Sequence, residues 1–466
     1  MNMTAISSYL RHMFAVALLF CLCSFSYASI GNPEKILFSP DSSKIAFMWS
    51  ENFYKFALIP IDTPLLKKEI YVYLCNTTKH HELRSFKVDT LEQGKVYDSL
   101  DIRFSPDSSY LAVFTSSRLS IIDSETNKLW RLAEGQEVTS FQWLGNSQIG
   151  YCVHQPAQDD SSHFEKVFWK QNVTDRLETR SLIYKESPEK NEDSSYKLHE
   201  SWSPQGRYVI FLTNHLQKNS LFNLLNIRQG KILLSFGKPE SFAAMNNLQG
   251  DGIGINWEGN GISWKGNDTE VFCAAGIVGK SQNAQAYLID TENSRILDCS
   301  KDFLETFGTD ISPCVMGEWT PDGKFIPVND YLDLGSCLIQ PVPWKVIRLQ
   351  EKLALHLKLD EKYKPALFPV PMLGWIGINA IGVDGKYAAD ESTKYAIDYS
   401  GQKLLKLFDT KGWWDCSPDG RYAAVIGWNK NLTVHKLDTS KFIISTANTP
   451  RRKDLFSRRS TEPRRE

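Results

Sequence analysis

The chain has 466 residues, of which 42% are hydrophobic and 12% aromatic, enough for one large repeat domain or for two or three domains of ordinary size. Its formal net charge is −1, so the whole chain offers no strong electrostatic field for nucleic acid. These values exclude a nucleic-acid-binding protein of the strongly basic kind.

The N-terminal segment has the features of an export signal. Arg11 precedes an apolar run at residues 13–23, which is too short to span a bilayer as a helix. The sequence Ser-Tyr-Ala at residues 26–28 then offers a small-x-small cleavage site. We therefore predict a cleaved signal peptide at residues 1–28 and an exported protein, periplasmic or secreted. An uncleaved anchor is the alternative, and no later stretch of sequence predicts a transmembrane segment.

A ten-residue pattern recurs after this leader. It consists of an aromatic residue, Ser-Pro-Asp, one or two small residues and a run of β-formers. Proline sets φ for a turn, aspartate accepts backbone N–H bonds within it, and the apolar run that follows suits a buried strand. The pattern therefore predicts a strand, a tight turn and a second strand. The five clear copies are FSPDSSKIAF at 38–47, FSPDSSYLAV at 104–113, WSPQGRYVIF at 202–211, WTPDGKFIPV at 319–328 and CSPDGRYAAV at 416–425.

The turn position that favours positive φ is glycine in three of these copies, namely Gly206, Gly323 and Gly420. Ser42 and Ser108 replace that glycine in the first two copies. The replacement predicts a different type of turn at these two places.

Three weaker copies bring the number of units to eight. They lie at residues 141–151, 262–272 and 381–389, and the last keeps only Asp384-Gly385 from the turn. Further runs of β-formers separated by polar turns follow most of the copies, so each unit supplies about four strands. Four strands per unit are typical of a β-propeller blade.

We therefore predict an all-β protein in which a β-propeller of about eight four-stranded blades fills residues 29–448. Seven blades is the alternative, in which the 381–389 unit belongs to its neighbour. The last unit, at 413–446, has enough sequence for all four strands, so no strand need come from the N-terminus.

Four segments depart from this pattern. Residues 344–364 combine charged and apolar residues, and we predict a helical insertion in the sixth blade. Residues 250–266 are rich in glycine and are interpreted as a loop. Pro327 interrupts a strand and predicts an edge or a bulge. Residues 449–466 form a basic tail that we predict to be disordered.

The repeated unit resembles the WD40-like (PD40) repeat of TolB-type propellers, which also occurs in the propellers of prolyl-oligopeptidase-like enzymes. The resemblance covers residues 30–445 approximately, and it implies the fold but no ligand. The peptidase relatives carry a hydrolase domain after the propeller. No G-x-S-x-G motif is present here and only the tail follows the last unit, so we expect no hydrolase domain.

No catalytic, metal-binding or cofactor-binding residue is predicted, and the binding residues remain unknown. The nine histidines are scattered, and His80 and His81 are expected to be exposed at the tip of a hairpin. The seven cysteines after the leader include no C-x-x-C pair, and we interpret them as free buried side chains. One or two bridges are the alternative, such as Cys299 with Cys314 or Cys337.

The fold leaves several classes of function open. The favoured hypothesis is a monomeric, non-catalytic scaffold that binds a protein or a glycan, with another envelope or extracellular protein as partner. The alternative is a propeller enzyme, lyase-like or hydrolase-like, with its site at the mouth of the central channel. A sensor of a small molecule or metal is a third possibility. Three or more His, Asp or Glu side chains converging at the channel mouth would favour the enzyme.

Overall fold

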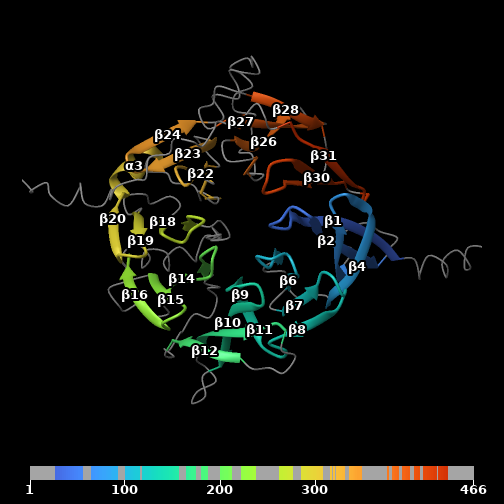
Figure 1. The fold of residues 1–466 in the computed structure, drawn as a ribbon, viewed down its shortest axis with the longest axis horizontal. Helices are drawn as coiled ribbons and strands as arrows, with labels where there is room; N and C mark the ends of the chain where they lie inside the picture. Colours follow the sequence, from blue (N-terminus) through green and yellow to red (C-terminus); the bar gives the residue numbers. More distant parts are fainter. Residues whose placement is uncertain are drawn as a thin grey trace, which may run out of the picture.

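The computed structural model describes residues 27–55, 65–92, 100–115, 118–156, 164–174, 180–186, 200–212, 222–237, 262–275, 285–307, 315–316, 319–320, 322–330, 335–348, 375–376, 380–387, 391–398, 404–409, 413–427 and 429–438. Their strands form eight antiparallel sheets, which we number 1 to 8 in chain order. The sheets are arranged in a ring around one centre (Figure 1). The prediction of eight blades is therefore confirmed, and the alternative of seven is wrong.

The first four sheets contain four strands each. Sheet 1 comprises β1 (Tyr27–Phe38), β2 (Lys44–Lys55), β3 (Leu65–Asn76) and β4 (Lys79–Glu92). Sheet 2 comprises β5 (Leu100–Phe104), β6 (Tyr110–Thr115), β7 (Arg118–Asp123) and β8 (Leu129–Leu132). Sheet 3 comprises β9 (Glu137–Trp143), β10 (Gln148–Pro156), β11 (Phe164–Asn172) and β12 (Arg180–Lys185). Sheet 4 comprises β13 (Ser201–Trp202), β14 (Tyr208–Leu212), β15 (Phe222–Asn226) and β16 (Lys231–Phe236).

The other four sheets follow the same order. Sheet 5 comprises β17 (Ile262–Trp264), β18 (Glu270–Ala275), β19 (Gln285–Asp290) and β20 (Arg295–Asp298). Sheet 6 comprises β21 (Val315–Met316), β22 (Ile326–Asp330), β23 (Gly335–Pro341) and β24 (Trp344–Arg348). Sheet 7 comprises β25 (Trp375–Ile376), β26 (Ala380–Tyr387), β27 (Glu391–Asp398) and β28 (Leu404–Asp409). Sheet 8 comprises β29 (Trp413–Cys416), β30 (Tyr422–Ile426) and β31 (Leu432–Lys436).

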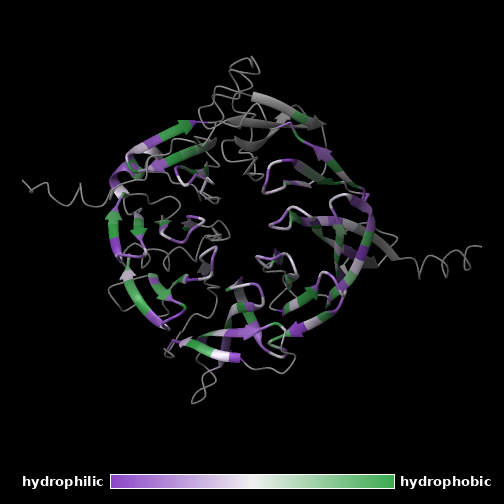
Figure 2. Cartoon of the chain, in the orientation of Figure 1, coloured by the Kyte–Doolittle hydropathy of each residue, from purple (hydrophilic) through white to green (hydrophobic). Residues whose placement is uncertain are grey.

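Within each sheet the strands pair in sequence order. The fourth strands, such as β4, β16 and β24, lie on the outside of the ring (Figure 1). Hydrophobic residues run along many of the strands, and the short connections near the centre are largely hydrophilic (Figure 2). Clusters of buried hydrophobic residues lie between sheets 1 and 2, 2 and 3, 3 and 4, 4 and 5, 5 and 6, and 8 and 1.

The Ser-Pro-Asp turns join the first and second strands through a repeated set of hydrogen bonds. Ser39 donates its hydroxyl hydrogen to Asp41, 2.5 Å away, and Asp41 also accepts the N–H of Ser43 at 3.0 Å. The N–H of Lys44 returns to the Ser39 hydroxyl at 2.9 Å. Equivalent bonds link Ser105 with Asp107, Thr320 with Asp322 and Ser417 with Asp419.

The serines that replace glycine in the first two turns adopt the conformation of the glycine. The φ angle is 60° at Ser42 and 64° at Ser108, against 67° at Gly206 and 65° at Gly323. The prediction of a different turn type at Ser42 and Ser108 is therefore wrong. The hydrogen bonds from the serine and the aspartate hold the backbone in the left-handed region although that region disfavours side chains.

A tryptophan at the start of several turns connects neighbouring sheets. Its indole N–H donates a hydrogen bond to the innermost strand of the preceding sheet. The bonds run from Trp143 to Arg103 O at 3.0 Å, from Trp202 to Ser140 Oγ at 2.9 Å, from Trp264 to Ser201 Oγ at 3.0 Å and from Trp319 to Ser263 O at 2.8 Å. These indole bonds thus connect sheets 2 to 6, each to the next.

The ring closes where sheet 8 packs against sheet 1. Phe47 and Trp49 from sheet 1 share one buried cluster with Ala424 and Ile426 from sheet 8. Because β1 pairs only with β2, sheet 1 keeps its own first strand among the described residues. Side-chain packing, one hydrogen bond and one ion pair join the two sheets, and β1 is not borrowed by sheet 8. A fourth strand of sheet 8 lies outside the described residues and stays a prediction.

Several local predictions are wrong. Residues 344–348 form the outer strand β24 instead of beginning a helix, because Trp344 and Val346 pack on the core of sheets 5 and 6. Pro327 lies in a middle strand without a bulge, since β21 reaches only Val328 and Asn329 and needs no donor from the proline. Asp384 and its neighbour Gly385 lie inside β26, opposite β27, and do not form a turn.

Two further segments differ from the sequence interpretation. Residues 262–264, at the end of the predicted glycine-rich loop, form strand β17. A helix that the sequence did not predict, α3 (Ser300–Phe307), follows β20 and buries Phe303 in the core between sheets 5 and 6. Among the described residues, no helix has the length and apolarity that a membrane crossing requires. Of the predicted leader at residues 1–28, only Tyr27 and Ala28 are described, and they begin β1. The rest of the leader and the tail at 449–466 lie outside the described residues, and both segments stay predictions.

Candidate functional site

The two faces of the ring carry different connections. Because successive strands are antiparallel, the tight turns between first and second strands all lie on one face, which we call the turn face. The connections between second and third strands, and those between successive sheets, begin and end on the opposite face, which we call the loop face. The longest of them are residues 237–261 and 349–374.

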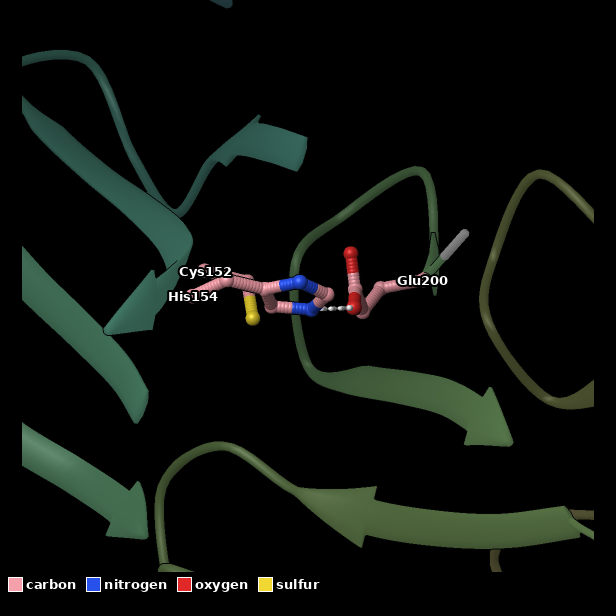
Figure 3. A group of neighbouring side chains, drawn as sticks. All are labelled: Cys152, His154 and Glu200. Atoms are coloured by element: carbon pink, nitrogen blue, oxygen red, sulfur yellow. Dashed lines mark ion pairs between the residues drawn. The ribbon is translucent and has the colours of Figure 1, made fainter. Parts of the chain in front are cut away.

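One cluster of potential metal ligands occurs among the described residues, toward the loop face between sheets 3 and 4. Cys152 and His154 lie on β10, two residues apart, so their side chains leave the same side of the strand. Glu200 directly precedes β13 and points at them from the next sheet (Figure 3). One ligand atom from each residue lies within 4.8 Å of the other two.

Two more side chains surround the carboxylate of Glu200. The Thr139 hydroxyl donates a hydrogen bond of 2.8 Å to Oε2. The ammonium of Lys166 and the Nε2 atom of His154 each lie 3.5 Å from Oε1. The side chain of Glu200 is fully buried, that of Lys166 is 2% exposed and that of His154 is 23% exposed. The charge of the carboxylate is therefore balanced inside the protein.

The surroundings shift the ionisation of both acidic groups. Burial opposes ionisation of Glu200, but Lys166, His154 and Thr139 outweigh it, so the pKa of Glu200 lies well below its usual range. Burial and the nearby Glu200 carboxylate raise the pKa of the Cys152 thiol well above its ordinary value. At neutral pH the cluster thus holds a charged carboxylate and an uncharged thiol.

This arrangement restricts the chemistry available without a metal. A thiol acts as a nucleophile only as its thiolate, and Cys152 is held protonated. The Glu200 carboxylate has no exposed surface from which to reach a substrate as a base. Cys152, His154 and Glu200 nevertheless offer sulfur, nitrogen and oxygen ligands of the kinds that bind zinc.

No sequence pattern predicted this cluster. A Cys-x-His pair on one strand was its only local signal, and Glu200 is brought to the pair by the packing of two sheets. The histidines considered from the sequence, His80 and His81, lie at the start of β4 after a tight turn, as expected, and His81 is 74% exposed. Among the described residues, no metal-ligand group includes them.

The prediction that the cysteines are buried is confirmed for those that the structure describes. Cys75, Cys152, Cys273 and Cys416 are free and buried. Cys299 and Cys337 are buried in the core between sheets 5 and 6. Cys314 lies outside the described residues, so bridges that involve it stay predictions.

The eight sheets in a ring define the chain as an eight-bladed β-propeller. No family model and no curated protein matches the chain. Solved structures, in contrast, do match it. A tricorn protease is 10% identical, with a TM-score of 0.41, and the match covers 88% of this chain but only 42% of that one. An oligogalacturonate lyase in complex with manganese is 12% identical, with a TM-score of 0.42 and coverage of 89% and 91%.

A further match is TolB from Acinetobacter baumannii, which is 11% identical with a TM-score of 0.29, and the match covers 72% of this chain and 76% of that one. A WD40 domain also matches. The predicted resemblance to TolB-type and WD40-like propellers is confirmed in that both kinds of propeller are among the matches. These likenesses concern the fold, and they assign no ligand and no reaction to this chain.

Proposed function

We propose that this β-propeller is an exported, non-catalytic scaffold that binds a protein or a glycan on its loop face, with an envelope or extracellular protein as the favoured partner. The observation that carries the proposal is the difference between the two faces. Short hydrogen-bonded turns occupy the turn face, whereas the connections from β16 to β17 and from β24 to β25, the longest of the chain, begin and end on the loop face. Loops held by a rigid framework are the usual place for recognition.

The state of the buried cluster supports a scaffold over an enzyme. The carboxylate of Glu200 is paired with the Lys166 ammonium, and the thiol of Cys152 is protonated. An enzyme needs an accessible base or nucleophile, and a paired carboxylate and a neutral thiol without exposed surface supply neither.

The proposal is tested by capturing partners with matched variants of the two faces. The bait is the chain from residue 29 onward, and the prey is the envelope fraction of the native source. The loop-face variant replaces residues 238–261 with a short glycine-serine linker, and the turn-face control is Arg421→Ala, since Arg421 is 65% exposed. We expect the wild type and the control to retain the same partner and the loop-face variant to lose it without a change in thermal unfolding.

Equal retention by all three baits would contradict binding through the loop face. Export is tested separately by determining the mass of the protein recovered from the envelope or the medium. Cleavage after residue 28 is expected, and an intact N-terminus on recovered protein would contradict the signal peptide.

A further inference from the structure

Two buried polar atoms of the cluster between sheets 3 and 4 face each other without a hydrogen bond. His154 Nε2 and Glu200 Oε1 are both inaccessible, and among the described residues neither makes a hydrogen bond of normal geometry, although Oε1 lies 3.5 Å from both His154 Nε2 and the Lys166 ammonium. They lie 3.5 Å apart, with the sulfur of Cys152 beside the imidazole ring (Figure 3). Buried polar atoms normally have partners, and a missing ion is one explanation for atoms that lack them.

From this geometry we propose that Cys152, His154 and Glu200 bind one zinc ion that links sheet 3 to sheet 4. Zinc takes thiolate, imidazole and carboxylate ligands at about 2.0 to 2.3 Å, which places tetrahedral ligand atoms about 3 to 4 Å from one another. The three atoms lie within 4.8 Å of one another already, so side-chain movements of about 1 Å bring them within range of one ion, and a water molecule takes its fourth position. Calcium and magnesium are excluded because both require shells of oxygen ligands.

The backbone prepares this site. Cys152 and His154 are held two residues apart by the ladder between β10 and β11, in which Cys152 faces Phe168 and His154 faces Lys166. The third ligand belongs to the next sheet, and no strand pairing joins sheets 3 and 4 among the described residues. An ion at this place would therefore add a bond between two sheets that are otherwise held by side chains.

Lys166 decides the charge balance. Binding exchanges the thiol proton of Cys152 for the metal, and the proton leaves to solvent. The resulting thiolate and the Glu200 carboxylate together carry two negative charges, which match those of the ion. The Lys166 ammonium then remains beside the carboxylate and competes with weakly bound cations, so only an ion with strong affinity for sulfur and nitrogen is retained.

Cobalt(II) provides the most direct test, because a cobalt–thiolate bond gives a charge-transfer absorption that a site without sulfur lacks. The purified chain from residue 29 onward is titrated with Co²⁺, which is then displaced by Zn²⁺. We expect one equivalent of Co²⁺ to produce the band, and Zn²⁺ to remove it and raise the unfolding temperature. Cys152→Ser should abolish the band, and His154→Gln and Glu200→Gln should each weaken binding at least about tenfold.

The matched control is Cys273→Ser, which changes another free buried cysteine, in sheet 5. It should leave the band unchanged. If Cys152→Ser does not fold, His154→Gln decides the result, since its side chain is partly exposed and its replacement leaves the core intact. A folded wild type that shows no band, or a band that survives Cys152→Ser or is unaffected by His154→Gln, would overturn the site.

Discussion

Ser203 in sheet 4 donates its hydroxyl hydrogen to Asp268 in sheet 5, across 2.7 Å. In the other clear copies the serine or threonine of the turn binds the aspartate two residues later, but here that position is Gln205. Asp268, which is fully buried, also accepts the N–H of Gln205 at 2.9 Å and that of Arg207 at 3.3 Å. The neighbouring sheet thus supplies the carboxylate that this turn lacks.

This relationship predicts a specific pattern in a double-mutant cycle. Asp268→Asn should lower the free energy of unfolding by about 1 to 3 kcal/mol, because one of the two acceptor oxygens becomes an NH₂ donor and the buried donors bound to it lose their acceptor. Gln205→Asp alone should also destabilise, because it places a second carboxylate beside Asp268. The double variant should be more stable than either single variant, because the carboxylate introduced within the turn then takes over the bonds of Asp268. The free energy of unfolding of each variant is measured by denaturant unfolding. If the effects of the two single substitutions simply add in the double variant, the introduced carboxylate does not take over the bonds of Asp268.

The indole bonds between sheets predict a second measurable coupling. Trp264→Phe and Ser201→Ala each remove one side of a 3.0 Å hydrogen bond between sheets 5 and 4. The coupling free energy of the pair, measured by denaturant unfolding of the single and double variants, should be about 0.5 to 1.5 kcal/mol. The packing lost with the larger ring lowers the stability of Trp264→Phe separately and does not enter the coupling. Trp413→Phe serves as the control, since Trp413 is 48% exposed, and it should change stability little. A coupling near zero would show that the indole bond does not fix the neighbouring sheet.

Two substitutions at equivalent positions of the turns should change stability in opposite directions. Ser42→Gly should stabilise by about 0.5 to 1 kcal/mol, because glycine accepts a φ of 60° at little steric cost. Gly206→Ala should destabilise by more than this, since an added Cβ would lie 2.6 Å from the carbonyl oxygen of Trp143. Thermal unfolding of the two variants measures these changes in stability. If both variants are stabilised, or both are destabilised, to the same extent, the prediction is wrong.

Asp101 predicts a loss of stability in acid. Burial opposes its ionisation, but Lys35 and Arg103 outweigh it, so its pKa falls from 3.8 to about 2. Because the folded pKa is the lower one, the stabilisation is present above the unfolded value of 3.8 and is lost as pH falls toward 2. Asp101→Asn should therefore destabilise at neutral pH and have little effect near pH 2. The free energy of unfolding is measured across this range, and a pH-independent effect would contradict the linkage.

The repeats allowed most of the fold to be predicted, because each Ser-Pro-Asp turn is a local structure written in consecutive residues. Eight units gave eight sheets, including the weak unit around residue 381. The misplaced turn at Asp384 and the unexpected strand at Trp344 show the limit of local patterns. In both places the pairing with a neighbouring strand decided the structure.

The candidate site depended on contacts that no local pattern contains. Glu200 and Cys152 are separated by a whole hairpin and by a connection between sheets, and only the packing of two sheets brings them together. The same reason hid the role of Asp268, which serves a turn in a different repeat. A pattern confined to one unit cannot reveal a residue that acts on the next unit.

The contact between sheets 8 and 1 is the one junction of the ring that the chain itself does not bridge. Every other pair of adjacent sheets remains tethered by the polypeptide when its packing loosens. Here the N–H of Phe38 donates a hydrogen bond of 3.3 Å to the Asp415 carboxylate, and Lys430 forms an ion pair with Glu51. Non-covalent contacts alone therefore join these two sheets. We therefore expect the ring to open between sheets 8 and 1 before any single sheet unfolds. Amide hydrogens of β1 and β29 should then exchange with solvent earlier than those of β9 and β13.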